Sequence, residues 1–419
     1  MEFRVGVNTI PQYLDQGNQI GEMSVTAIRN VQLQEAQVEP PVVCEGTPHQ
    51  MGCGQGAAVR RVLATAPQTL KNLEAFCVSK PWWLPHEVFR RIAGRKSRQM
   101  LESALSEDFS VARERLHGIA AGAGVRVEEV YLLNALEAMM CSVGECTVTP
   151  PLGGCSAFAV RGAMAATGEP IVAHNFDYLP LIQPFYMLRE SRPRDRLRSL
   201  EFTTAPMCGA VDGMNEAGLC ITYNYAYSTD NEQPSGLISM AISEALQGCT
   251  TVTEAAEWIA SRPRWGSGVL MLADAEGDIG SLELSATRTE LRRPQAGEDR
   301  IFHSNCYSTD VMREVEVGPT AVFTSKAPSP LRGKRVLSSS ECRNARFERL
   351  LASRSPLDAG AVTKVMSDHG ENGEPSSNTI CMHSDYWCTT ASLQFFPRRR
   401  QMRVAYSSAC GAQYEEFEL

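Results

Sequence analysis

Apolar residues recur every three or four positions through much of the first third of the chain, with charged residues between them. This spacing is typical of helices that bury one face. It predicts helices over residues 57–76, 95–123 and 127–140. Up to a loop at 142–154, the chain is therefore expected to be almost wholly helical.

The pattern changes after this loop, where short apolar runs are bounded by turn-forming residues. Segments 156–160 and 168–173 predict a β-hairpin whose first strand begins at Cys155. Similar runs predict further strands at 200–204, 219–225, 268–273, 279–284, 391–396 and 402–407. Helical spacing returns at 238–247, 252–261, 341–352 and 358–367. Such a mixture of strands and helices predicts a layered α+β sandwich.

Composition narrows the class of protein. The chain has 419 residues, of which 43% are hydrophobic, and a net charge of −8. This composition predicts a globular protein and argues against binding to nucleic acid or to a membrane surface, which both favour a basic face. No apolar run reaches the roughly 18 residues that a membrane span needs. Residues 1–40 are polar and are expected to form an extension, and the first residues lack the apolar core of a signal peptide. We therefore expect a cytoplasmic protein.

The 14 cysteines have no regular spacing, and most are expected to be free thiols. The stretch from Cys381 to Cys388 includes His383 and Asp385, which are residue types that bind zinc. Its spacing matches no common two-plus-two zinc pattern, so the sequence predicts no metal site. Buried free cysteines are the favoured interpretation.

The most informative stretch is Pro-Pro-Leu-Gly-Gly-Cys-Ser-Ala at 150–157. If the Gly154–Cys155 bond is cleaved, Cys155 becomes an N-terminus that carries a thiol and an amine. Because an α-amine titrates at about 7.7–8.0, it can act as the base that activates the thiol. Two glycines before the cysteine favour the contorted backbone that attack on the Gly154 carbonyl requires. On this stretch alone, an ordinary surface loop is the competing interpretation.

Several motifs, read in order, resemble the acyl-coenzyme A:6-aminopenicillanate acyltransferase family. They are Gly46-Thr-Pro-His-Gln-Met-Gly52, His117-Gly-Ile-Ala-Ala-Gly-Ala-Gly124, Gly154-Cys155, Asn175-Phe-Asp177, Asp212-Gly-Met-Asn-Glu-Ala-Gly-Leu219, His303-Ser-Asn305 and Ser367-Asp-His-Gly370. The fifth motif is also similar to bile salt hydrolases and penicillin V acylases. The resemblance implies an N-terminal-nucleophile (Ntn) hydrolase with a four-layer αββα sandwich. It also implies a zymogen with three parts: an extension at 1–40, a helical α-chain at 41–154 and a β-chain at 155–419, the last two in one integrated fold.

The resemblance assigns roles to individual residues. Cys155 would be the nucleophile, and Asp177 would hold its amine or thiol in place. The side-chain amide of Asn305 and the backbone N–H of Asn224 would stabilise the oxyanion. Supporting roles would fall to Asn175 and Thr379. One departure concerns the family stretch Ser-Ile-Cys-Arg-His, which is Thr-Ile-Cys-Met-His at 379–383 in this chain. Because Met382 carries no charge, either Arg403 or another base compensates, or the substrate lacks the matching charge.

The predicted function is autoproteolytic hydrolysis or formation of a linear, non-peptide amide through a Cys155 thioester, in small-molecule or natural-product metabolism. No cofactor is expected, although an acyl-thioester such as acyl-CoA could be a co-substrate. The expected partners are the small-molecule substrates and the two cleaved chains themselves, with homo-oligomerisation left open. A set of aromatic residues is a candidate acyl pocket: Trp82, Trp83, Phe158, Phe176, Tyr178, Phe185 and Tyr186. Two alternatives remain, a non-cleaving binding protein on the same fold and a Cys–His thiol hydrolase that uses His174, His303 or His369.

Overall fold

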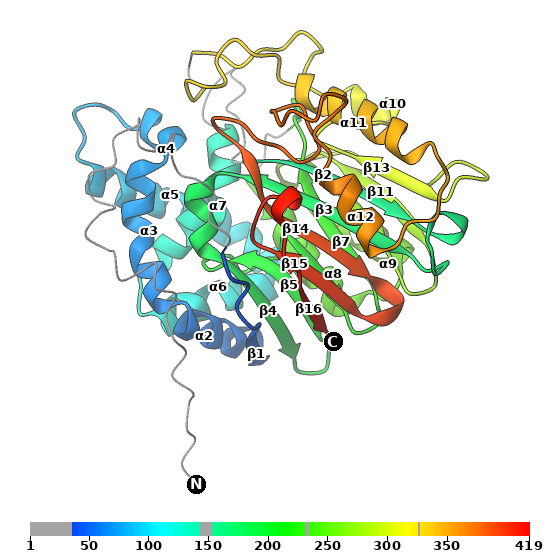
Figure 1. Cartoon of the computed structure of the whole chain (residues 1–419). Helices are drawn as coiled ribbons and strands as arrows, with labels where there is room; N and C mark the ends of the chain where they lie inside the picture. The colour runs from blue at the N-terminus through cyan, green and yellow to red at the C-terminus, as the bar shows by residue number, and fades with distance from the viewer. Residues whose placement is uncertain (1–35, 143–152, 231–233, 326) are drawn as a thin grey trace. The chain divides into compact units, whose positions relative to one another are not determined.

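The computed structural model describes residues 36–142, 153–230, 234–325 and 327–419 (Figure 1). The described residues before Cys155 contain six helices, where the apolar spacing predicted three helical segments. The six helices are α2 (Pro48–Ala58), α3 (Arg60–Asn72), α4 (Glu74–Val78), α5 (His86–Asp108), α6 (Ser110–Ala123) and α7 (Val127–Ser142). The segment predicted as one helix at 95–123 is divided by buried Phe109, whose non-helical backbone separates α5 from α6. The segment predicted as one helix at 57–76 forms α3 and α4, whereas α2, which begins at a capping box of Thr47 and Gln50, was not predicted.

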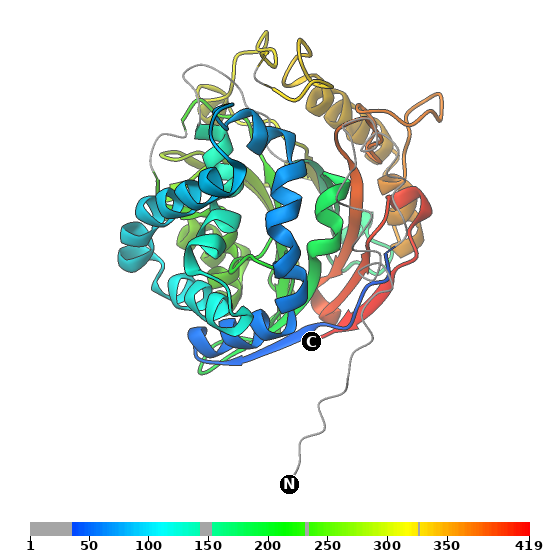
Figure 2. The same cartoon turned by 90° about the vertical axis from the view of Figure 1, so that its left-hand side faces the viewer.

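Two of the motifs form a close crossing of helices α2 and α6. A Cβ atom added to Gly52 would lie 2.1 Å from the Arg115 carbonyl oxygen. One added to Gly118 would lie 2.2 Å from the carbonyl oxygen of His49. Glycine is therefore required by the approach of the two backbones, and these motifs have a packing role. Figure 2 shows these helices, in blue and cyan, gathered on one face of the molecule.

Two large sheets form the centre of the fold. The eight-stranded sheet has the order β1-β4-β5-β6-β7-β10-β11-β12, and the six-stranded sheet has the order β13-β2-β3-β14-β15-β16. The first comprises β1 (Val42–Gly46), β4 (Tyr186–Pro193), β5 (Ser199–Thr204), β6 (Asp212–Asn215), β7 (Cys220–Tyr225), β10 (Gly268–Ala273), β11 (Ile279–Leu284) and β12 (Thr289–Arg292). The second comprises β2 (Gly153–Val160), β3 (Ile171–Tyr178), β13 (Arg300–His303), β14 (Cys388–Phe396), β15 (Gln401–Ala405) and β16 (Glu415–Glu418). A short separate pair is formed by β8 (Gly236–Leu237) and β9 (Arg264–Trp265).

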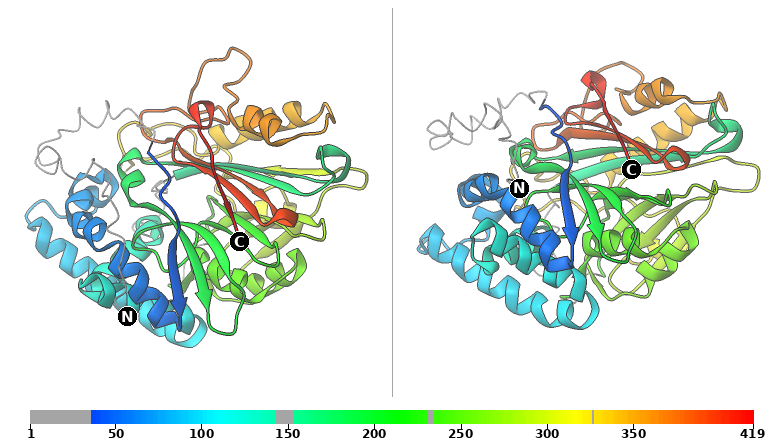
Figure 3. Two further views of the ribbon diagram at one scale, coloured as in Figure 1. Left: turned by 60° about the horizontal axis from the view of Figure 1, so that its bottom comes forward. Right: turned by 90° about the horizontal axis from the view of Figure 1, so that it is seen from below.

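The layers follow from which apolar residues pack together. One cluster lies between the two sheets and includes Val172 and Leu393 from one sheet with Leu200 and Met271 from the other. A second cluster covers the outer face of the eight-stranded sheet with the N-terminal helices, α8 (Ile238–Gly248) and α9 (Val252–Ala260). A third covers the outer face of the six-stranded sheet with α11 (Ser338–Leu351) and α12 (Ala359–Met366). The α+β, αββα sandwich is therefore confirmed, and Figure 3 shows the stacked sheets with helices outside them.

Every strand and helix predicted after Cys155 is present, but several strands were missed. Strand β4 is an example, because its sequence Tyr-Met-Leu-Arg-Glu-Ser-Arg-Pro carries charges at positions that the fold buries. The Arg189 guanidinium is fully buried and donates through Nε to the Glu201 carboxylate on β5 at 2.6 Å. A buried charge pair of this kind hides a strand from any pattern based on apolar residues.

Smaller helical elements are α10 (Asp310–Arg313) and the 3₁₀ turns η5 (Pro397–Arg399) and η6 (Ala409–Gly411). Further 3₁₀ turns are η3 (Gly162–Met164) and η4 (Pro180–Phe185). Within the described residues, no helix is both long and apolar enough to cross a membrane. The described elements belong to a compact unit, Gln34–Leu419. Within it, β1 pairs with β4, so the segments before and after residue 155 share a sheet.

Candidate active site

Cys155 lies near the start of strand β2, in the predicted hairpin with β3. Its partner across the strands is Phe176, and Gly154 is paired with Asp177. The backbone around the candidate cleavage site is therefore a regular strand, and Gly154 does not have a positive φ angle. The expectation of an irregular, contorted loop at 153–155 is wrong, since β2 begins two residues before the cysteine. The preceding loop residues, 143–152, lie outside the described part of the chain.

The Cys155 thiol is buried in the layer between the sheets. Burial, followed by the charge of Asp177, raises the pKa of this thiol well above its usual value. The thiol is therefore neutral near pH 7 in the intact chain, and its reaction requires a base. An amine released at the same residue would supply one.

Asn305 holds the backbone of the candidate nucleophile. It follows strand β13, and its Oδ1 accepts a hydrogen bond from the Cys155 N–H at 2.9 Å. The same oxygen accepts from Arg343 Nη2 at 2.8 Å, while Asn305 Nδ2 donates to the Tyr225 carbonyl at 2.7 Å. Because two neighbours only donate and the third only accepts, they fix the orientation of the amide. In the intact chain, the oxygen of Asn305 thus faces the N–H of the Gly154–Cys155 peptide bond.

Arg343 was missed by sequence analysis, although its guanidinium contacts Cys155, Ser156 and Asn305. It lies on helix α11, is 2% exposed and donates to the Cys155 carbonyl and, at 2.9 Å, to Ser156 Oγ. The available signal was its place on the buried face of α11, in line with Ser340, Phe347 and Leu351. An arginine at such a position must be paired, which marks it as a candidate site residue.

Asp177 lies on strand β3, is fully buried and faces the Arg343 guanidinium. Its Oδ1 accepts from Thr389 Oγ1 at 2.6 Å, and its Oδ2 lies 3.8 Å from Arg343 Nη1. Burial raises the pKa of Asp177 to about 6, although the charge of Arg343 and the Thr389 hydrogen bond act in the opposite direction. The carboxylate is therefore mostly ionised at neutral pH and places a negative charge close to Cys155.

Arg343 also bears on the departure at Met382. The sequence offered Arg403 as a compensating base, but Arg403 binds Gln394 at 2.8 Å and Glu416 at 3.0 Å instead. The cation beside Asp177 is Arg343, and Met382 contributes an apolar contact near Gly154. The positive charge is thus supplied from a different element of the chain.

The other predicted residues take different positions. Asn175 donates to the Met366 and Ile380 carbonyls at 2.9 and 3.0 Å, so it ties strand β3 to two neighbouring segments. Thr379 forms a local turn through the Cys381 carbonyl at 2.6 Å. The Asn224 N–H lies on the β10 side of strand β7, because it alternates in step with the N–H of Ala226, which donates to Ser267. The Asn224 N–H therefore points toward strand β10 within the sheet, and its predicted role in an oxyanion site gains no support from this geometry.

Two of the three candidate histidines are fully buried. His174 pairs with Asp212 at 2.6 Å, and His303 pairs with Ser281 at 2.8 Å. Burial lowers the pKa of His303 well below its usual value. Among the described residues, no histidine forms a hydrogen bond with Cys155. The geometry thus gives no support to a Cys–His pair at Cys155.

A cavity opens on Cys155 between the N-terminal helices and the sheets, and none of its lining residues is charged. Of the predicted aromatic set, Phe176, Tyr178 and Phe185 line it. The others do not: Trp82 and Trp83 are 92% and 65% exposed, Phe158 packs under the outer helices, and Tyr186 packs between the sheets. Helix residues Leu70, Leu133 and Leu136 complete the apolar wall. The residues that line a second cavity include Gly154, Asn305 and Arg343.

The sequence model of a known family, described as acyl-coenzyme A:6-aminopenicillanic acid acyl-transferase, matches residues 164–406. This match covers more than half of the chain. The chain belongs to this family. Membership supports an enzyme that acts on amides by acyl transfer or hydrolysis. No curated protein matches the chain by sequence.

Several solved structures are similar at a lower level. An N-acylethanolamine-hydrolyzing acid amidase ortholog from Caenorhabditis elegans is 14% identical, covers 58% of this chain and 93% of its own, and has a TM-score of 0.38. A variant of the conjugated bile acid hydrolase from Clostridium perfringens is 11% identical, with 63% and 97% covered and a TM-score of 0.40. Penicillin V acylase from Agrobacterium tumefaciens is 15% identical, with 63% and 86% covered and a TM-score of 0.37. At such TM-scores, these likenesses carry no argument about activity.

Proposed function

We propose that this family member is a self-processing cysteine amidohydrolase or acyltransferase of the Ntn type. The observation that carries the proposal is the position of Cys155: its N–H is bound by Asn305, and its thiol borders an uncharged cavity. Attack of the thiol on the Gly154 carbonyl would form a thioester and release the amine of Cys155. Water would then cleave the thioester and free Gly154 as a carboxylate, which leaves Cys155 as an N-terminal residue.

The freed amine would serve as the base for the second activity. In the intact chain, Asn305 Oδ1 already accepts from this nitrogen, and the Asp177 carboxylate lies on the adjacent strand. Both groups favour a protonated amine, so they would stabilise the cation that forms when the amine takes the thiol proton. The thiolate would then attack an amide or thioester substrate to give an acyl-enzyme, which water or an amine resolves.

The substrate class follows from the cavity. Its uncharged lining favours an apolar acyl group on a linear, non-peptide amide, as in small-molecule or natural-product metabolism. An acyl-thioester such as acyl-CoA would suit the same pocket as a donor. The twelve described cysteines are all free, which supports a reducing compartment such as the cytoplasm.

A series of N-acyl 4-nitroanilides with acyl chains of increasing length tests this proposal. The value of kcat/KM is expected to rise roughly fourfold for each buried methylene, since each contributes about 0.8 kcal/mol. A succinyl analogue with a terminal carboxylate should react poorly. The mass of the Cys155–Leu419 fragment should increase by that of the acyl group, and added hydroxylamine should release it as a hydroxamate.

Two variants serve as a matched pair in this assay. Leu133→Trp narrows the cavity and should shift the preference to shorter acyl chains. Trp83→Ala removes an exposed aromatic residue and should leave the preference unchanged. A processed protein whose Cys155 fragment gains no acyl mass from any substrate in the series would contradict the proposed activity.

A further inference from the structure

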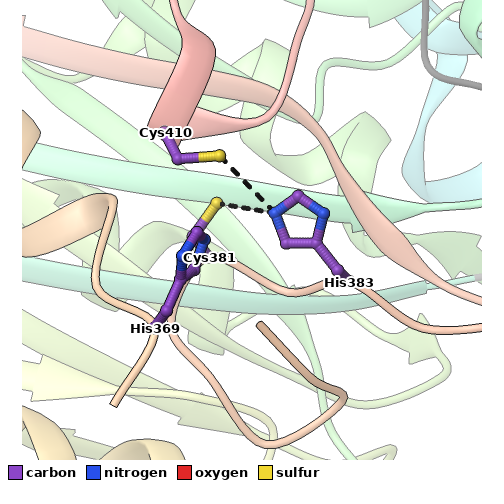
Figure 4. A group of neighbouring side chains, drawn as sticks. All are labelled: His369, Cys381, His383 and Cys410. Carbon is purple, nitrogen blue, oxygen red and sulfur yellow. Dashed lines mark hydrogen bonds between the residues drawn. The ribbon is translucent and has the colours of Figure 1, made fainter. Parts of the chain in front are cut away.

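Four potential metal ligands that are far apart in the sequence meet at the outer side of the six-stranded sheet. His369 follows helix α12, Cys381 and His383 lie in the loop before β14, and Cys410 lies in the 3₁₀ turn η6. Their ligand atoms all lie within 4.8 Å of one another (Figure 4). The sequence showed Cys381 and His383 as possible ligands but predicted no metal site, because the fold joins three separate segments and leaves out Cys388 and Asp385.

Two distances within the group match those around a tetrahedral ion. His383 Nε2 lies 3.4 Å from Cys381 Sγ and 3.6 Å from Cys410 Sγ. Tetrahedral zinc, with Zn–S of about 2.3 Å and Zn–N of about 2.0 Å, places sulfur and nitrogen ligands about 3.5 Å apart. Figure 4 shows His383 directing one ring nitrogen at both sulfur atoms.

The fourth ligand provides an independent indication. His369 Nε2 is buried and has no hydrogen-bond partner, which is costly for a polar atom unless something binds there. The ring of His369 packs edge-on to that of His383, with centroids 5.2 Å apart. This ring nitrogen is one of the two through which His369 could bind an ion shared with His383 and both sulfurs.

The backbone around the group is held in place by bonds of its own. Cys381 N–H donates to the Asp368 carbonyl at 3.1 Å, and Ser367 Oγ donates to the Ala409 carbonyl at 2.9 Å. The three segments are thus joined without an ion, so binding requires little rearrangement. We propose that His369, Cys381, His383 and Cys410 form a structural Cys₂His₂ site for zinc.

The site would stabilise the loop that supports Asp177. Met382, next to Cys381, donates its N–H to Thr389 Oγ1 at 2.8 Å, and the same hydroxyl donates to Asp177. Zinc would therefore act as a clamp for a positioning residue of the proposed catalytic site. Metal binding itself can be measured without reference to that activity.

Metal content of the full-length protein, purified in reducing buffer without chelator, is the test. We expect about one zinc per chain by inductively coupled plasma mass spectrometry, and at least a tenfold loss in Cys410→Ser, whose side chain is exposed and should not be needed for folding. Cys53→Ser is the matched control. Cys53 Sγ also lies 3.6 Å from a histidine nitrogen, but among the described residues it belongs to no group of three or more potential metal ligands. Removal of zinc with a chelator should lower Tm of the wild type and Cys53→Ser by roughly 5 °C, with no change in Cys410→Ser.

Cobalt provides a geometric readout. Co²⁺ added to the zinc-free protein should give the visible absorption of a tetrahedral thiolate complex, and Cys410→Ser should weaken it. A wild-type protein that retains no zinc or cobalt after desalting would overturn the proposal, as would equal zinc in the wild type and Cys410→Ser. A Cys381–Cys410 disulfide in place of metal, detected by intact mass without reductant, would also overturn it.

Discussion

Replacement of Asp177 by Asn should increase stability above pH 6 while it abolishes processing. The carboxyl is fully buried, and its pKa is raised from 3.8 to about 6. Between these two pH values the folded chain binds more protons at this site than the unfolded chain. The free energy of unfolding therefore decreases as pH rises through this window. The stabilising effect of protonation is present below about pH 4 and lost above about pH 6.

The expected size follows from the shift. At about 1.4 kcal/mol per pKa unit, ionised Asp177 costs roughly 3 kcal/mol of stability above pH 6. Asn cannot ionise and can still accept from Thr389 Oγ1, so it should avoid most of this cost. For a chain of this length, 3 kcal/mol corresponds to a Tm difference of about 4 °C.

The assay compares Cys155→Ala with Cys155→Ala/Asp177→Asn, because both chains stay uncleaved. Urea unfolding is measured from pH 4 to pH 8 for each protein. The difference between the two free energies of unfolding should grow from near zero at pH 4 to roughly 3 kcal/mol at pH 8 in favour of the Asn variant. Parallel curves, or a less stable Asn variant at pH 8, would refute the reasoning about this buried carboxylate.

Three further predictions concern the groups around the site and the helix crossing. Arg343→Met should block processing and lower the free energy of unfolding by about 3–5 kcal/mol, because it removes the cation beside Asp177. Arg403→Met should leave processing intact. Cleavage on gels and urea unfolding test both variants, and a cleaved Arg343→Met protein would contradict this role of Arg343. Asn305→Ala should slow processing about tenfold in a time course by mass, since it removes the acceptor of the Cys155 N–H and a hydrogen bond of this kind contributes about 1 kcal/mol; an unchanged rate would rule that role out. Gly118→Ala should lower the free energy of unfolding by about 1–3 kcal/mol. Gly54→Ala should be neutral or stabilising, because its added Cβ meets nothing closer than 3.9 Å. Equal effects of the two substitutions would contradict the packing argument.

Much of the fold could be predicted because its core strands carry uninterrupted apolar runs. Strands β10 and β11 begin and end where the sequence predicted, and both are wholly buried. Strand β4 could not be found in this way, since its buried Arg189 is neutralised by Glu201 from another strand. A charge pair that forms only in the folded chain leaves no periodic signal.

The site was predictable to a similar extent. Cys155, Asp177 and Asn305 were found from their motifs, and the fold brings them together with Arg343. Arg343 belongs to a helix about 190 residues after the nucleophile, and no local pattern links the two. The same holds for His369 and Cys410, whose proximity depends on where α12 ends and η6 begins.

Intact mass under denaturing conditions, for the wild type beside Cys155→Ala, tests the central claim most directly. The account predicts two chains in the wild type, Met1–Gly154 and Cys155–Leu419, and one full-length chain in the variant. Full-length protein in both samples would contradict processing at Gly154–Cys155, and with it the terminal amine as the catalytic base.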